Sequence, residues 1–239
     1  MDKLLVALDV ETGRRALDLA SALEGVAGGF KVGSRLFTRE GPELVRSLGA
    51  SGAHVFLDLK FHDIPNTVAQ AVDAAVHTGA WMINVHASGG VAMMEAAVQA
   101  GREAAQRLRR PPPLLIAVTV LTSMDEAGLR DTGIQRSLLD HVVALARMAQ
   151  AAGLDGVVAS PQETASIHKA CGDRFIIVTP GIRGASAGNE PNDQMRTMGP
   201  AEAIQAGASY VVVGRPIIGA PDPRAAAVTI ADELGRDRP

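Results

Sequence analysis

Short apolar runs of strand length recur along the chain, and a stretch with helical spacing of apolar residues follows each of them. In the first pair, Leu4–Leu8 is continuously apolar and Glu11–Leu23 repeats Ala and Leu at helical spacing. This pattern predicts a strand followed by a helix. Seven further runs predict strands: Gly29–Gly33, the run that starts at Val55, Met82–Val85, Leu114–Leu121, Gly156–Ala159, Phe175–Val178 and Tyr210–Val213.

Helical spacing separates these predicted strands. The later predicted helices are a stretch through Pro42–Leu48, Asn66–His77, an Ala-rich stretch behind Gly89-Gly90, Leu138–Ala152, Pro161–Ala170, Pro200–Ala206 and Pro223–Leu234. Strand and helix thus alternate eight times in 239 residues without a change of composition that would mark a domain boundary. Eight such units predict a closed (β/α)8 TIM barrel of the α/β class, a single domain over residues 1–239. A doubly wound open sheet is the alternative, although such sheets more often have about five or six strands.

Composition narrows the classes of function. The chain is 47% hydrophobic and 3% aromatic, so its core must consist mainly of Ala, Val, Leu and Ile, as α/β packing allows. With 23 basic and 26 acidic residues, the net charge of −3 does not indicate a nucleic-acid or membrane binder, and any anion site must be local. Cys171 is the only cysteine, which excludes an internal disulfide framework and fits a reducing compartment. No apolar run resembles a signal peptide or reaches the roughly 20 residues of a membrane span, so we expect a soluble, cytoplasmic protein.

The third predicted strand carries unexpected charge. The segment Val55–Thr67 begins as an apolar run and then places Asp58 and Lys60 two residues apart, which in a strand puts both on one face. Asp63 follows, and the second predicted strand carries Lys31, so an alternating Lys-Asp-Lys-Asp array is possible in which the ammonium groups stay protonated. A structural ion pair is the alternative, but buried ion pairs are weak evidence for stability. We therefore interpret these charges as functional.

Polar residues also collect at the ends of the other predicted strands, where barrel enzymes build their active sites. The residues at or just beyond such ends are Asp9, Lys31, Asp58, Lys60, His86, Thr122 and Arg215. Their coincidence predicts one site at the mouth of the barrel.

Two segments are candidates for binding an anion. Gly214 and Arg215 follow the last strand, where a glycine amide and a guanidinium predict a phosphate site, although this pair is also common in simple turns. The polar loop from Gly181 through Gln194 has the composition of an active-site lid, with Arg183 and Gln194 near its ends, or of a solvated connection.

Four further polar positions allow a structural interpretation beside a functional one. Thr122 and Ser123 offer hydroxyls after the fifth strand, or form a Ser/Thr turn. His62 and His86 are interpreted as structural hydrogen-bonding residues, and no pair of histidines has the spacing of metal ligands.

A family resemblance accounts for these positions together. The segment Asp58-Leu-Lys60-Phe-His-Asp63-Ile-Pro-Asn-Thr67 resembles the signature of the orotidine 5'-phosphate decarboxylase family. Shorter motifs agree with it in order: Ala7-Leu8-Asp9, Phe30-Lys31-Val32-Gly33, Asn84-Val85-His86-Ala87, Val120-Leu121-Thr122-Ser123, Pro180-Gly181-Ile182-Arg183, Asn192-Asp193-Gln194 and Val213-Gly214-Arg215. The Asp-x-Lys-x-x-Asp core alone is shared with sister phosphosugar enzymes, whereas the ten-residue signature with Gly-Ile-Arg is specific.

The resemblance implies conversion of orotidine 5'-phosphate to uridine 5'-phosphate and CO2 in pyrimidine biosynthesis, by a homodimer without metal or cofactor. It implies that Lys60 protonates C6 of the pyrimidine and that Asp58 lies near the substrate carboxylate. It assigns the other positions as follows: Asp9 and Lys31 to ribose hydroxyls, Asp63 and Thr67 to the site of the partner subunit, Thr122 and Ser123 to the ribose and pyrimidine, and Arg183, Gln194, Gly214 and Arg215 to the 5'-phosphate.

Two alternatives remain at this stage. A magnesium-dependent phosphosugar enzyme of the same superfamily would carry a Glu where Lys31 stands, and Lys31 would repel a divalent cation. A catalytically inert nucleotide-binding barrel would have no need of the array formed by Asp58, Lys60 and Asp63.

Overall fold

The computed structural model describes residues 3–181 and 198–235, and within them eight parallel strands form a closed barrel in chain order. The strands are β1 Leu4–Ala7, β2 Gly29–Gly33, β3 Val55–Phe61, β4 Met82–His86, β5 Leu114–Val118, β6 Gly156–Val158, β7 Ile176–Thr179 and β8 Tyr210–Val213. The barrel closes where β1 pairs with β8, with Leu5 opposite Val212. This pairing confirms the predicted barrel and excludes the open sheet.

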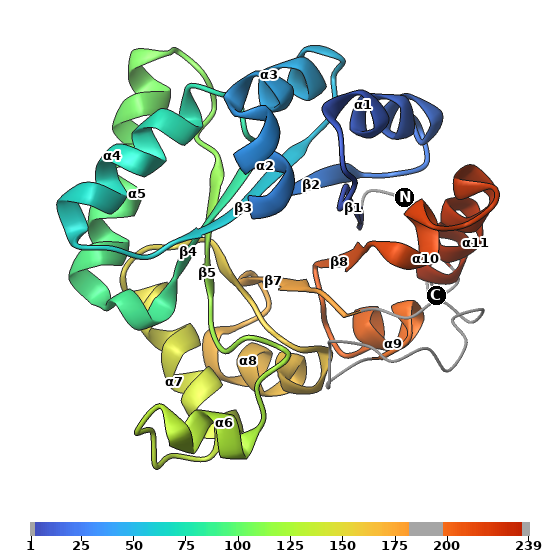
Figure 1. Ribbon diagram of the computed structural model, residues 1–239. Coiled ribbons are helices and arrows are strands. Elements are labelled where there is room, and N and C mark those ends of the chain that lie inside the picture. The colour runs from blue at the N-terminus through green and yellow to red at the C-terminus, as the bar shows by residue number, and fades with distance from the viewer. Residues whose placement is uncertain (1–2, 182–197, 236–239) are drawn as a thin grey trace.

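Helices connect the strands and lie outside them (Figure 1). They are α1 Gly13–Ala22, α2 Ser34–Glu40, α3 Pro42–Ala50, α4 Pro65–Val76, α5 Val91–Arg107, α6 Glu126–Asp131, α7 Leu138–Ala151, α8 Thr164–Cys171, α9 Pro200–Gln205, α10 Arg215–Ile218 and α11 Pro223–Gly235, with 3-10 turns at Ala87–Gly89 and Pro161–Glu163. Among these described helices, none has the length and apolar character needed to span a lipid bilayer.

Two apolar clusters make the core. The larger one joins strand residues to helix residues, for example Leu57 of β3 and Val72 of α4, and so lies between the barrel and its helices. The smaller one is built on Leu5, Ala7, Phe56, Met82, Ile116, Val178 and Val212, which all come from strands. These residues therefore fill the barrel interior.

The inward residues determine which side chains reach the barrel mouth, because side chains alternate along a strand. Phe56 and Met82 face inward, so Asp58 and Asn84, two residues further along β3 and β4, are directed to the next layer of the interior. Val212 likewise precedes Gly214 by two residues. The apolar residues that fill the barrel interior are therefore followed, toward the mouth, by the polar residues Asp58 and Asn84.

The helical stretch predicted through Pro42–Leu48 is in fact preceded by a separate helix. Gly41 has a φ of 70°, which ends α2 and leaves Pro42 to start α3. Two short helices, α6 and α10, were not predicted, and β5 ends at Val118 rather than at Leu121. Helices of four to six residues offer too few positions for a periodic pattern to be recognised.

Candidate active site

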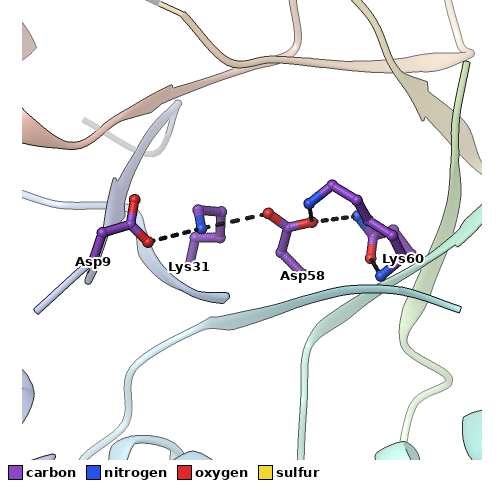
Figure 2. Close-up of polar contacts among 5 residues, drawn as sticks. Asp9, Lys31, Asp58 and Lys60 are labelled. Carbon is purple, nitrogen blue, oxygen red and sulfur yellow. Dashed lines mark hydrogen bonds and ion pairs between the residues drawn. The ribbon is translucent and has the colours of Figure 1, made fainter. Parts of the chain in front are cut away.

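Four charged side chains, one just after β1 and three from β2 and β3, form a line at the mouth of the barrel (Figure 2). Lys31 Nζ lies 3.3 Å from Asp9 Oδ1 and 3.4 Å from Asp58 Oδ2, and Lys60 Nζ lies 2.6 Å from Asp58 Oδ1. Acid and amine therefore alternate as Asp9, Lys31, Asp58 and Lys60. We call these four residues the charged array.

The middle of the array is buried and its ends are open to solvent. The side chains of Lys31 and Asp58 are each 12% exposed, whereas those of Lys60 and Asp9 are 37% and 57% exposed. A molecule at the barrel mouth can therefore reach more of Lys60, whereas it can reach only the small exposed parts of Lys31 and Asp58.

The enclosed carboxylate of Asp58 remains ionised. Burial works to raise its pKa, but the positive charges of Lys31 and Lys60 outweigh burial, and hydrogen bonds from Lys60 and Asn84 add to their effect. The net result is that the pKa of Asp58 lies below its ordinary value of 3.8. Asp58 thus provides a fixed negative charge between two ammonium groups.

Lys60 has an unusual backbone. Its φ is 53°, in the left-handed region that residues other than glycine seldom adopt. This conformation coincides with a register shift between β3 and β4, where Leu57 pairs with Ile83 and the next pair is Phe61 with Val85. Holding a non-glycine residue in such a region costs about 1–3 kcal/mol, and such strain is found preferentially at functional sites.

Asn84 contacts two members of the array and was not among the predicted site residues. Its Oδ1 accepts the backbone N–H of Lys60 at 2.8 Å, and its Nδ2 donates to Asp58 Oδ1 at 2.7 Å. The available signal was a polar residue inside the apolar strand Met82–Val85.

Asp63 and Thr67 do not join the array of their own chain. Both are exposed, and Asp63 Oδ1 accepts the N–H of the adjacent Ile64 at 2.6 Å. Within the described residues, no ion pair links Asp63 to Lys60. Asp9 thus provides the second carboxylate beside Lys31, and within residues 3–181 and 198–235 Asp58 is the one carboxylate that pairs with Lys60.

The end of β8 adjoins the array. A Cβ placed on Gly214 would lie 3.7 Å from Asp9 Oδ2 and 3.4 Å from Ala7 Cβ, so the backbone of β8 passes close to the first carboxylate. Arg215 follows and is exposed. This geometry puts the predicted anion-binding pair at the same mouth as the array.

Four other predicted site residues are Thr122, Ser123, Arg183 and Gln194. After β5, Thr122 is half-buried and Ser123 is exposed. Arg183 and Gln194 lie outside the residues that the structure describes.

The two histidines near the array stack on each other, with ring centroids 5.3 Å apart. His86 Nδ1 lies 2.7 Å from Ser88 Oγ. Burial, together with the charges of His62 and Lys60, lowers the pKa of His86, so its ring remains neutral at neutral pH. Among the described residues, no group of three or more His, Cys, Asp and Glu side chains has an arrangement that could hold a metal ion.

Comparison with known proteins agrees with this geometry. The model of the orotidine 5'-phosphate decarboxylase / HUMPS family matches residues 2–230. The chain belongs to this family. It is 54% identical over 234 residues to the orotidine 5'-phosphate decarboxylase of Moorella thermoacetica, a match that covers 98% of this chain and 92% of the relative. The corresponding enzyme of Syntrophotalea carbinolica is 53% identical over 232 residues, covering 97% and 94%.

Solved structures of the family have the same fold. The crystal structure of orotidine 5'-phosphate decarboxylase from Lactobacillus acidophilus superposes with a TM-score of 0.85 at 36% identity, covering 97% of this chain and 98% of the other. The predicted family resemblance is therefore confirmed.

Proposed function

We propose that this protein decarboxylates orotidine 5'-phosphate to uridine 5'-phosphate and CO2, a step of pyrimidine biosynthesis, in the cytoplasm. The observation that carries the proposal is the charged array, in which Lys60 Nζ lies 2.6 Å from a buried carboxylate and remains open to the barrel mouth. The high identity to relatives that carry this name supports the same reaction.

The chemistry explains the need for such an array. Loss of CO2 from C6 leaves an electron pair in the plane of the ring, orthogonal to the π system, so the ring cannot delocalise it. An external charge must stabilise the developing carbanion. The protonated Lys60 provides that positive charge and then donates the proton that converts C6 to C–H. Asp58 keeps Lys60 charged and oriented, because its own carboxylate is ionised and only 2.6 Å away.

The other predicted residues complete the substrate site in this proposal. Asp9 and Lys31 bind ribose hydroxyls, and Thr122 and Ser123 lie along the ribose and pyrimidine. Gly214 and Arg215 bind the 5'-phosphate, which the position of Gly214 beside Asp9 supports. Arg183 and Gln194 would complete the phosphate site from the loop outside the described residues. Binding of the phosphate, which is remote from C6, can then accelerate decarboxylation, because part of the binding energy holds the charged array in place.

The proposal includes a homodimer in which Asp63 and Thr67 serve the partner's site. Two observations support it: both residues are exposed and stand apart from the array of their own chain, and the neighbouring Ile64 is 67% exposed although it is apolar. Among the described residues, Asp58 is the one carboxylate paired with Lys60, and a partner's aspartate would supply a second.

A phosphosugar activity that depends on magnesium is the main alternative within the family. In the array, the ammonium of Lys31 stands between the carboxylates of Asp9 and Asp58, within 3.4 Å of both. A divalent cation bound by those carboxylates would meet this positive charge, so the donor set does not fit a metal. Exhaustive treatment with EDTA is expected to leave the turnover of orotidine 5'-phosphate intact, and strict dependence on magnesium would refute the proposal.

The direct test follows pyrimidine absorbance and CO2 release from orotidine 5'-phosphate. Wild-type protein is expected to produce uridine 5'-phosphate, and Lys60→Ala is expected to lose nearly all activity with its circular dichroism unchanged, because no other group occupies its place beside C6. Lys169→Ala, which removes an exposed lysine of α8, is the matched control and retains full activity. Normal turnover by Lys60→Ala would refute the assigned role. Absence of turnover in the wild type would favour an inert binding barrel.

A further inference from the structure

We infer that Asn84 is a positioning residue of the decarboxylation site, which holds the strained backbone of Lys60 and the carboxylate of Asp58 in one fixed geometry. The inference rests on the proposed function and goes beyond it, because it concerns a residue that would not touch the substrate. Asn84 forms two hydrogen bonds, one with the backbone of Lys60 and one with the carboxylate of Asp58.

Asn84 stands where the ladder between β3 and β4 is interrupted. Between the pairs Leu57 with Ile83 and Phe61 with Val85, β3 advances four residues while β4 advances two. Asn84 is the single β4 residue in that interval. Its side-chain oxygen accepts the Lys60 N–H and so replaces a ladder hydrogen bond that the register shift removes.

The orientation of the Asn84 amide is fixed by its partners. The Lys60 N–H can only donate, so it must meet the oxygen of the amide, and the ionised carboxylate of Asp58 can only accept, so it must meet the nitrogen. Asn84 is 0% exposed, so water cannot substitute for either contact at the amide. The amide satisfies both partners at once, because its oxygen accepts and its nitrogen donates, and it adds no charge.

The consequence for Lys60 is geometric. A φ of 53° turns the backbone of Lys60 out of the extended path, and its ammonium then meets Asp58 Oδ1, the oxygen that also accepts from Asn84. Without the Asn84 oxygen, the Lys60 N–H loses the acceptor that holds it in this conformation, and relaxation toward extended φ would move Nζ from its contact with Asp58 Oδ1. Asn84 would thus act on the reaction through the placement of Lys60.

The test compares two substitutions at this position. Asn84→Leu keeps a similar volume and removes both hydrogen bonds, and we expect kcat to fall about 100-fold, as a misplacement of roughly 1 Å can cause. Asn84→Asp places a second carboxyl beside Asp58. When protonated, that carboxyl has one acceptor and one donor like the amide it replaces, so kcat relative to wild type should recover as the pH falls, and Asn84→Leu should show no recovery.

A purely structural role is separated by binding measurements. If Asn84 positions Lys60 and Asp58 without being needed for folding, both variants remain folded. Calorimetry with uridine 5'-phosphate should then give the wild-type number of sites per chain although kcat falls. Thr119→Val is the matched control: Thr119 is a buried residue after β5 whose hydroxyl donates to Val158 O, and its loss should leave kcat unchanged.

Three results would overturn the inference: Asn84→Leu with wild-type kcat, a loss of binding sites in proportion to the loss of kcat, or equal pH profiles for the two variants. Failure of the proposed function is distinguishable, since it would show as an inactive wild type. In that case the crystal structure of Asn84→Leu is the test. We expect the φ of Lys60 to change from its positive value in this variant. A φ near 53° with Nζ still bonded to Asp58 would refute the inference.

Discussion

At the scale of residues, the array solves the problem of burying charge. Lys31 and Asp58 are each costly to enclose alone, and each is enclosed with two partners of opposite charge. The four side chains sum to zero charge. The array can therefore remain ionised in the apolar barrel, and the ammonium of Lys60, at its open end, is available for a carbanion.

The charge on Asp58 leads to a prediction about acid stability. Its pKa in the folded protein lies below the ordinary value of 3.8, so its stabilising contribution is present above that value and is lost as the pH falls through the lower folded value. Lys31→Met removes the larger of the two Coulombic effects that lower the pKa of Asp58, while burial continues to raise it. The folded pKa should rise, and acid unfolding followed by circular dichroism should begin at higher pH than in wild type. Lys169→Met is the control, and an unchanged midpoint in Lys31→Met would contradict the prediction.

The sequence predicted an array of Lys31, Asp58, Lys60 and Asp63, whereas in the structure Asp9 and not Asp63 joins the other three, and Asn84 supports them. Asp58 and Lys60 were visible because charge interrupts an apolar strand. Alternation predicted them on one face of an extended strand, whereas their contact depends on the positive φ of Lys60. That conformation follows from the register shift between β3 and β4, which no pattern within either strand encodes. The role of Asn84 therefore emerged from the structure alone.

At the scale of elements, two strand glycines show how the barrel separates catalysis from stability. A Cβ on Gly33, at the end of β2, would lie 2.9 Å from Lys31 Nζ, the mobile tip of a long side chain. A Cβ on Gly156, in β6, would lie 2.1 Å from the backbone carbonyl oxygen of Ile176. The first clash can be relieved by moving the lysine, and the second requires a shift of a strand.

We predict opposite phenotypes for the two alanine variants. Gly33→Ala should lower kcat/KM by about 10- to 100-fold with little change in Tm, since a displaced Lys31 disturbs the array. Gly156→Ala should retain the array but lose about 1–3 kcal/mol of unfolding free energy, which for a chain of this size lowers Tm by roughly 2–10 °C. Thermal unfolding and steady-state kinetics on both proteins check the pair. A lower Tm for Gly33→Ala with unchanged kcat/KM would contradict the prediction that this glycine matters for activity and not for stability.

The elements themselves were largely predictable. Predicted and observed strands agree at all eight positions within a few residues, because each short apolar run in a doubly covered parallel sheet must be a buried strand. The ends of the strands were less predictable. A strand was predicted over Leu114–Leu121, but β5 ends at Val118 although Val120 and Leu121 are still apolar. Pairing with the neighbouring strand decides where β5 stops, and hydropathy carries no information on that partner.

At the scale of the whole molecule, the site is assembled from both ends of the chain. Asp9 follows the first strand and Gly214 follows the last, and closure of the barrel through β1 and β8 brings them together. The stretch between β3 and α4 has the opposite character. Residues 62–67 are all exposed, Ile64 among them, at the same mouth as the array. In the proposed dimer, this stretch would contact the second subunit and cover the side chain of Ile64.

The proposed dimer predicts that two inactive proteins will restore activity when their subunits mix. If Asp63 serves the partner's site, a dimer of one Lys60→Ala and one Asp63→Ala subunit holds one site with both defects and one site with neither. Random mixing makes half of the dimers mixed, so recovery should reach about one quarter of wild-type activity per chain. Co-refolding the two variants and assaying orotidine 5'-phosphate turnover gives the measurement.

The matched control for this experiment mixes Lys60→Ala with Asp58→Ala. Asp58 and Lys60 contact each other within one chain, so every site of a mixed dimer would carry one of the two defects, and no recovery is expected. Recovery in the first mixture together with none in the second requires Asp63 and Lys60 to act from different subunits. Failure of both mixtures, with subunit exchange verified by two affinity tags, would place Asp63 outside the partner's site.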